Sequence, residues 1–258
     1  MSTAPQKSSP RNPPVVVGLL RASGETIEGP RPCDWFDAFV DDRGDLVVLL
    51  LDAPSGIDSF DGLVATIAYE THAALRRCMP LHAVVSGLQV QLAAQPGLEV
   101  GVLILRLSQQ DAKVELLNAG MPALASADPG GGLQLYPALS GPVGRRVGEA
   151  HPYELLPLLW DGTWLALSDG MLNGSRESAA VSVLCAKIEL GSRGPELSRS
   201  TREELYDAFQ GLLPSARFLR DDATGVVVSV CPGARFQSGI ERGSGATAKT
   251  IVSSRPEQ

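Results

Sequence analysis

An apolar run that ends abruptly in an acidic turn, VVLLLDAPSG over residues 47–56, most constrains the fold of this chain. A short apolar run flanked by turn signals is typical of a buried strand, although periodicity alone does not distinguish it from a buried helix. The β-branched pair Val47 and Val48 and the preceding turn favour the strand. Such a strand delivers Asp52 to a sheet edge, where the acid either caps the following helix or holds a cation.

Acidic residues also stand at other predicted strand ends, namely Asp34, Asp37, Asp169, Asp221 and Asp222. The first two lie in CDWFDAF, which leads through the turn at residues 41–45 into the Asp52 strand, so the two segments are predicted to form a hairpin. Aspartate is common in turns and at helix caps, so each acid taken singly is more often structural. Acids at four strand ends far apart in sequence can nevertheless bring several carboxylates into one pocket.

Composition and charge exclude several classes of protein. The 258-residue chain is 44% hydrophobic, which allows one large domain, and it has no apolar run of about eighteen residues that would cross a membrane. Its net charge of −7 without a basic cluster argues against nucleic-acid binding. The polar N-terminus lacks the apolar core of a signal peptide, so we expect a cytoplasmic protein. The four cysteines show no paired spacing, which argues against a zinc site or a disulfide framework.

Hydrophobic periodicity predicts segregated strands and helices between two disordered tails at residues 1–14 and 233–258. The expected helices span about 60–78, 81–94, 177–190 and 200–212, and the expected strands span 15–22, 33–39, 47–52, 100–107, 113–120, 133–139, 154–160, 163–170 and 224–230. Two hairpins are predicted within the later strands, one at residues 100–120 and one at residues 154–170. Segregated runs of this kind indicate an α+β domain over residues 15–232, with two stacked sheets flanked by helix pairs.

Six short motifs occur in a fixed order, namely CDWFDAF, VVLLLDAPSG, VELLNAGMPAL, GPVG, WLALSDGML and DDATGVVV. Together they resemble the metal-dependent serine/threonine phosphatases of the stage II sporulation protein E and sigma-factor-regulator type, within the protein phosphatase 2C-like (PPM) superfamily. The resemblance runs from about Asp34 to Val230. It implies a four-layer αββα sandwich of two antiparallel sheets between helix pairs, with two Mn²⁺ or Mg²⁺ ions at its edge.

The resemblance also implies a set of metal ligands. Asp52 matches the acid that bridges both ions, and the backbone carbonyl of Ala53 matches a further ligand. The other matching acids are Asp34, Asp169 and Asp221, with Asp37 and Asp222 as second-tier candidates. Oxygen ligands suit hard divalent cations, and two such ions activate a water for attack on a phosphoryl group without a His or Cys nucleophile.

By the same resemblance, the substrate is phosphoserine or phosphothreonine on a small regulatory protein of the anti-sigma antagonist type. We expect no nucleic-acid or membrane partner. The sequence is compatible with a homodimer but does not decide the oligomeric state. The chain departs from the family pattern at Cys33, at the segment Pro54–Asp58 and at Met121. These departures leave a second interpretation open, a catalytically weak or inactive pseudophosphatase that binds a phosphoprotein.

Overall fold

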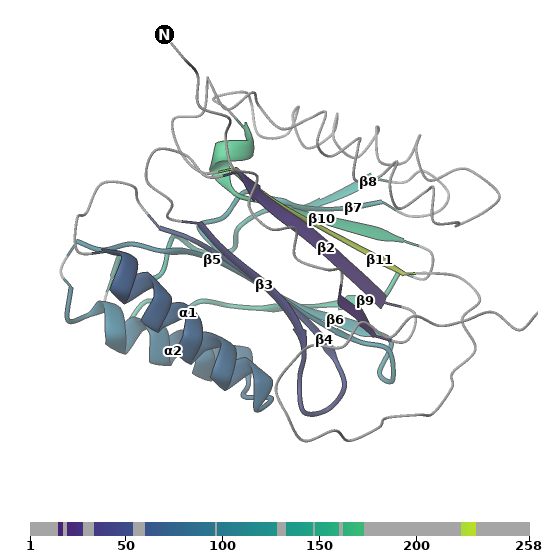
Figure 1. Ribbon diagram of the computed structural model, residues 1–258, viewed down its shortest axis with the longest axis horizontal. Helices are drawn as coiled ribbons and strands as arrows, with labels where there is room; N and C mark the ends of the chain where they lie inside the picture. The colour runs from purple at the N-terminus through teal and green to yellow at the C-terminus, as the bar shows by residue number, and fades with distance from the viewer. Residues whose placement is uncertain are drawn as a thin grey trace, which may run out of the picture.

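The computed structural model describes residues 15–17, 20–27, 34–53, 60–95, 97–127, 133–146, 148–159, 162–172 and 223–230. Its strands form two antiparallel sheets that pack face to face, and two helices cover the outer face of one sheet (Figure 1). The elements in chain order are β1 (Val15–Val17), β2 (Leu20–Ile27), β3 (Asp34–Val40), β4 (Leu46–Asp52), α1 (Phe60–Arg76), α2 (Leu81–Leu92), β5 (Gly101–Ser108), β6 (Lys113–Ala119), β7 (Leu124–Ala127), β8 (Leu133–Tyr136), β9 (Glu154–Pro157), β10 (Thr163–Leu167), the 3₁₀ turn η1 (Asp169–Leu172) and β11 (Ala223–Val230).

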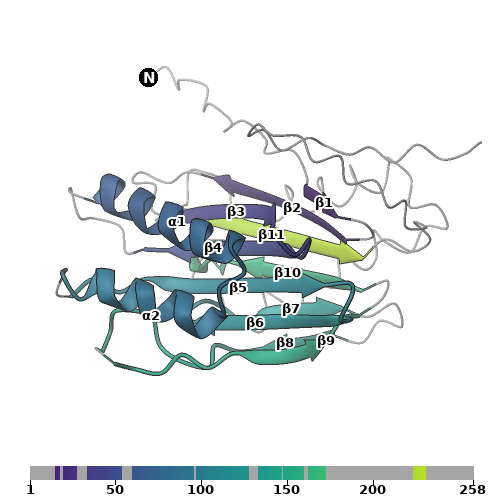
Figure 2. The same cartoon turned by 90° about the horizontal axis from the view of Figure 1, so that it is seen from below.

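The two sheets differ in size and in neighbours. One has five strands in the order β3-β4-β5-β6-β9, and the other has six in the order β1-β2-β11-β10-β7-β8. Every pairing between named strands is antiparallel. Figure 2 shows α1 and α2 lying side by side across the five-stranded sheet.

Strand β4 is buried on both faces, which explains its unbroken apolar sequence. Successive side chains of a strand point to opposite faces, so its odd and even positions enter different cores. Leu49 and Leu51 pack with the helices, whereas Val48 and Leu50 belong to the core between the sheets. This arrangement confirms the strand predicted from VVLLLD, and β3 pairs with it as the predicted hairpin.

Most of the predicted elements are present in the described residues, with one error of pairing. The segments around residues 154–160 and 163–169 were expected to form a hairpin, but they lie in different sheets. β9 pairs with β6 at an edge, where Leu155 is 63% exposed, whereas the buried β10 lies between β7 and β11. The chain therefore passes from one sheet to the other between β9 and β10. Two strands that follow each other closely in sequence can be joined in this way or by a hairpin turn, and the sequence alone does not distinguish the two.

Three of the four expected layers are described, namely one helix pair and two sheets. The helices expected at residues 177–190 and 200–212 lie outside the described residues, as do both predicted tails. The predicted strand at 15–22 is divided, because residues 15–17 form β1 and pair back onto β2. Within the described part of the chain, no helix is long and apolar enough to cross a membrane.

The connection between α1 and α2 is short and tightly turned. Cys78 takes the left-handed conformation (φ 59°), which at the end of a helix is usually adopted by glycine. Its N–H donates to the carbonyl of Leu75 at 2.9 Å. Pro80 then precedes α2. This turn places the carbonyl of Met79 against the five-stranded sheet.

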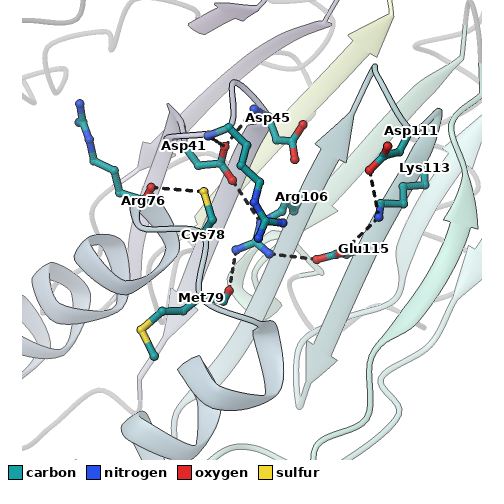
Figure 3. Close-up of polar contacts among 10 residues, drawn as sticks. Asp41, Asp45, Arg76, Cys78, Met79, Arg106, Asp111, Lys113 and Glu115 are labelled. Carbon is teal, nitrogen blue, oxygen red and sulfur yellow. Dashed lines mark hydrogen bonds and ion pairs between the residues drawn. The ribbon is translucent and has the colours of Figure 1, made fainter.

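Arg106 on β5 ties that turn to the sheet (Figure 3). Its side chain is nearly buried, and its guanidinium donates to the Met79 carbonyl at 2.8 Å and to Glu115 Oε2 at 3.0 Å. Arg106 Nε also lies 3.4 Å from Asp41 Oδ2, in the turn between β3 and β4. One buried cation therefore connects two hairpins and the helix layer at the end of the sheet away from Asp52.

Replacing Arg106 should be far more damaging than replacing the neighbouring cation Lys113. Arg106→Met leaves the carboxylates of Asp41 and Glu115 without their buried partner, which typically costs about 3–5 kcal/mol of unfolding free energy. Lys113 is 41% exposed and pairs with Asp111 at 3.1 Å, so Lys113→Met should cost less than about 1 kcal/mol. Urea denaturation of both variants checks this, and equal losses would contradict the assigned role of Arg106.

Candidate metal centre

Asp34 and Asp52 face each other across the pairing of β3 with β4. Asp34 is the first residue of β3 and Asp52 the last of β4, and the two are direct register partners. Directly opposed residues of an antiparallel pair have Cβ atoms about 4.5–5.5 Å apart. The hairpin therefore brings two of the acids singled out by sequence into reach of one cation.

Both acids lie on the side of the sheet that faces the second sheet. Even-numbered neighbours on the same strands, Phe36 and Leu50, contact the core between the sheets, and side chains two residues apart share a face. Asp34 and Asp52 are both partly buried. They therefore lie at one end of the layer between the sheets, where the apolar core gives way to carboxylates.

Asp37 lies on the opposite face. Its carboxylate Oδ2 is 2.6 Å from Nδ1 of His72 on α1, and the imidazole ring packs against Phe39 with 4.0 Å between ring centroids. The structure thus does not bring Asp37 together with Asp34 and Asp52. The odd spacing from Asp34 to Asp37 in a strand was the sequence signal for this separation, whereas nothing in the sequence singled out His72 as the partner.

Asp169 follows β10 and begins the turn η1, where it is exposed. The preceding residue, Ser168, is locked to the start of β11, since its N–H donates to the Thr224 carbonyl and its Oγ accepts the Thr224 N–H, both at 2.9 Å. The start of β11 pairs with Ile27 at the end of β2, a few residues before Asp34. Figure 1 accordingly shows the short green η1 turn at the same end of the sandwich as the start of β3.

The remaining predicted ligands are only partly described. Ala53 is buried and directly follows Asp52, whereas Asp221 and Asp222 lie outside the described residues, just before Ala223 of β11. Among the residues that are described, no group of three or more His, Cys, Asp or Glu side chains is close enough to hold a metal ion. Of the predicted ligand side chains that the structure describes, Asp34 and Asp52 are the two that lie opposite each other.

The NAGM segment, residues 118–121, forms a tight turn beside the end of the five-stranded sheet that carries Asp34 and Asp52. The buried amide of Asn118 bridges the turn, because Oδ1 accepts the Met121 N–H at 3.1 Å and Nδ2 donates to the Pro122 carbonyl at 2.9 Å. Gly120 has φ 77°, and a Cβ at this position would lie 2.6 Å from the backbone nitrogen of Pro142. Asn118 and Gly120 therefore have structural roles that the motif alone did not reveal.

No protein-family model matches the chain, and no curated protein matches it significantly. Solved structures do match. The RsbU and RsbW domains of a Mycobacterium tuberculosis protein share its fold with a TM-score of 0.72 at 18% identity, over 87% of this chain and 62% of that one. The PP2C phosphatase domain and regulatory fragment of SpoIIE from Bacillus subtilis match with a TM-score of 0.62 at 13% identity, over 82% and 62%.

A third match is the catalytic domain of the serine/threonine protein phosphatase PstP in complex with two manganese ions. Its TM-score is 0.60 at 15% identity, over 82% of this chain and 98% of that one. The chain has the PP2C phosphatase fold. It spans only 62% of the length of the first two structures.

The PstP structure contains two manganese ions, and the paired acids of this chain are chemically suited to such ions. Carboxylate oxygens are the donors that Mg²⁺ and Mn²⁺ prefer. Two carboxylates held opposite each other repel, and a cation between them relieves that repulsion. Asp34 and Asp52 therefore fit such a group.

The segment around GPVG, residues 141–144, packs against the NAGM turn, because the Gly120 N–H donates to the Ser140 carbonyl at 3.0 Å and Pro142 lies against Gly120. Ser140 Oγ in turn lies 2.7 Å from Nδ1 of His151. Burial lowers the pKa of His151, partly offset by the negative charge of Glu149. A neutral His151 is consistent with a packing role rather than a place in the acidic centre.

Two glycine substitutions test the packing of the NAGM turn. Gly97 and Gly120 both have positive φ, but a Cβ at Gly97 would meet open space. Gly97→Ala should cost about 1–2 kcal/mol for the left-handed backbone alone. Gly120→Ala should cost about 1–3 kcal/mol more, because the methyl group overlaps the Pro142 backbone. Thermal or urea unfolding of the two variants measures the difference, and equal losses would contradict the close approach.

Proposed function

We propose that this chain is a metal-dependent protein phosphatase that hydrolyses phosphoserine or phosphothreonine. The observation that carries the proposal is the direct cross-strand pairing of Asp34 with Asp52, at an open end of a fold that the chain shares with PP2C phosphatases. The resemblance of the six sequence motifs, which include both acids, supports it independently of the fold.

In this proposal the acids at one end of the sandwich would hold two ions. Asp34 and Asp52 would bind from neighbouring strands, with the Ala53 carbonyl as a further ligand beside Asp52. Asp169 after β10 would contribute as well, together with Asp221, which lies outside the described residues. When bound, two Mn²⁺ or Mg²⁺ ions supply an acidified water and offset the negative charge of the phosphoryl oxygens. The apolar core directly behind Asp34 and Asp52 limits their contact with water and so strengthens their attraction for a cation.

The proposed substrate is a phosphorylated regulatory protein. RsbU, RsbW and SpoIIE domains are among the proteins with similar structures, and the sequence motifs resemble those of sigma-factor-regulator phosphatases. A protein substrate of the anti-sigma antagonist type follows from that resemblance. Such a partner would present its phosphorylated side chain to the exposed end of the sandwich, where Asp169 lies.

A pseudophosphatase is the second candidate, and one observation favours it. The buried thioether of Met121 stands where the family motif places histidine, directly after the NAG turn. A chain that kept the fold and a cation but lost turnover would still bind a phosphoprotein. Hydrolysis and binding therefore have to be measured separately.

Asp52→Asn should abolish hydrolysis. We expect Mn²⁺-dependent hydrolysis of p-nitrophenyl phosphate or a phosphopeptide to fall by more than about 100-fold. Mutation of a residue that only supports a metal ligand typically lowers activity 10–100-fold, and loss of the ligand itself should lower it further. The matched control is Asp42→Asn, the same chemical change at an exposed position in the β3–β4 turn, away from Asp52.

Three outcomes distinguish the candidates. Wild-type turnover that is lost in Asp52→Asn and kept in Asp42→Asn supports the phosphatase. No turnover by the wild type, together with retained binding of a phosphopeptide, supports the pseudophosphatase. Wild-type turnover that survives Asp52→Asn, with an intact circular dichroism spectrum, contradicts the proposed centre.

A further inference from the structure

Gly101 on β5 is the strand partner of Asp52, on the side away from Asp34. A Cβ at Gly101 would lie 2.6 Å from Sδ of Met121 and 3.4 Å from Cβ of Asp52. The Met121 sulfur therefore occupies the place of the missing side chain, in a space that Asp52 also borders. We call this place, bounded by Gly101, Asp52 and Met121, the Gly101 notch.

Glycine at position 101 is explained by the lack of room for a side chain and not by an unusual backbone conformation. Gly101 lies within a regular strand and is not among the residues with positive φ. Any L-amino acid has access to such a backbone. A side chain at position 101 would therefore have to displace the Met121 sulfur from the notch.

Met121 is held in the notch from several directions. Its side chain is 3% exposed and belongs to the core between the sheets. Its backbone N–H donates to the buried amide of Asn118 at 3.1 Å, and the NAGM turn is closed against Pro142 through Gly120. An unbranched thioether is well suited to fill an irregular gap of this kind.

We propose that Met121 is a positioning residue for Asp52, and this inference rests on the proposed function above. The thioether closes one flank of Asp52, so that water does not hydrate that flank and the carboxylate is restricted to rotamers that face Asp34. A thioether is a poor ligand for hard cations such as Mn²⁺ and Mg²⁺, so Met121 acts through Asp52 and not by binding the ion. Residues that orient a metal ligand in this way commonly contribute 10–100-fold to metal affinity.

The test measures Mn²⁺ binding to the full-length chain by isothermal titration calorimetry, which does not depend on turnover. Met121→Ala opens the notch and should weaken Mn²⁺ binding by about 10-fold or more. Met121→Leu keeps most of the volume and should stay within about threefold of the wild type. The electron paramagnetic resonance spectrum of bound Mn²⁺ should broaden in Met121→Ala, because Asp52 becomes free to take several orientations.

A second substitution in the notch makes the test specific. Gly101→Ala places a methyl group 2.6 Å from the sulfur, well inside van der Waals contact, and should weaken Mn²⁺ binding by displacing Met121 or Asp52. In the double variant Gly101→Ala, Met121→Ala, the methyl group refills the notch. Binding should then be at least about threefold tighter than in Met121→Ala alone, a coupling expected for residues that share a contact or a cavity.

Val48→Ala is the matched control for loss of core packing. Val48 lies on the same strand and face as Asp52, four residues away, and is fully buried, so its truncation destabilises the core without touching the notch. It should leave Mn²⁺ affinity unchanged. Equal losses of affinity in Val48→Ala and Met121→Ala overturn the inference, since both would then report general loosening of the core.

The outcomes also separate this inference from the proposed function. If Asp52→Asn abolishes Mn²⁺ binding but Met121→Ala binds like the wild type, the positioning role is wrong and the metal centre stands. If the wild type shows no Mn²⁺ binding that depends on Asp52, the metal centre is wrong and the role of Met121 falls with it. A loss in Met121→Ala that the double variant recovers supports both.

Discussion

The burial of β4 on both faces is the constraint on which the rest of the arrangement depends. Its odd positions pack under α1 and α2, and its even positions pack against the second sheet. A slip of one residue would exchange these faces along the whole strand, so the register is strongly specified. Because Asp52 ends this strand, the same packing that stabilises the core also determines which face and which partner its carboxylate has.

The two ends of the five-stranded sheet are consequently different. At one end, Arg106 neutralises buried carboxylates and joins the hairpins to the α1–α2 turn (Figure 3). At the other end, Asp34 and Asp52 stand opposite each other, and the second strand partner of Asp52 is a glycine covered by a thioether. The paired acids therefore lie where the apolar layer between the sheets ends, and the proposed role of Met121 assigns the orientation of Asp52 in part to packing.

The sequence predicted the parts of this structure that depend on local pattern. The apolar β4, the hairpin with β3 and the helices α1 and α2 follow from periodicity and turn residues, and their strand ends carried the acids. Sheet membership was not predictable in the same way, because β9 and β10 are adjacent in sequence yet pair with β6 and with β7 and β11. The contacts of Met121 with Gly101 and of His72 with Asp37 also join distant segments, so no local pattern reveals them.

If Asp34 and Asp52 together hold a divalent ion, anomalous diffraction from crystals grown with Mn²⁺ will locate that ion between them. Data collected at the manganese absorption edge locate the ion without any assumption about activity. We expect an anomalous peak about 2.0–2.3 Å from carboxylate oxygens of both residues, which is the usual distance between a divalent ion and its oxygen ligands. Full occupancy of Mn²⁺ at other positions, with no peak between Asp34 and Asp52, would contradict it.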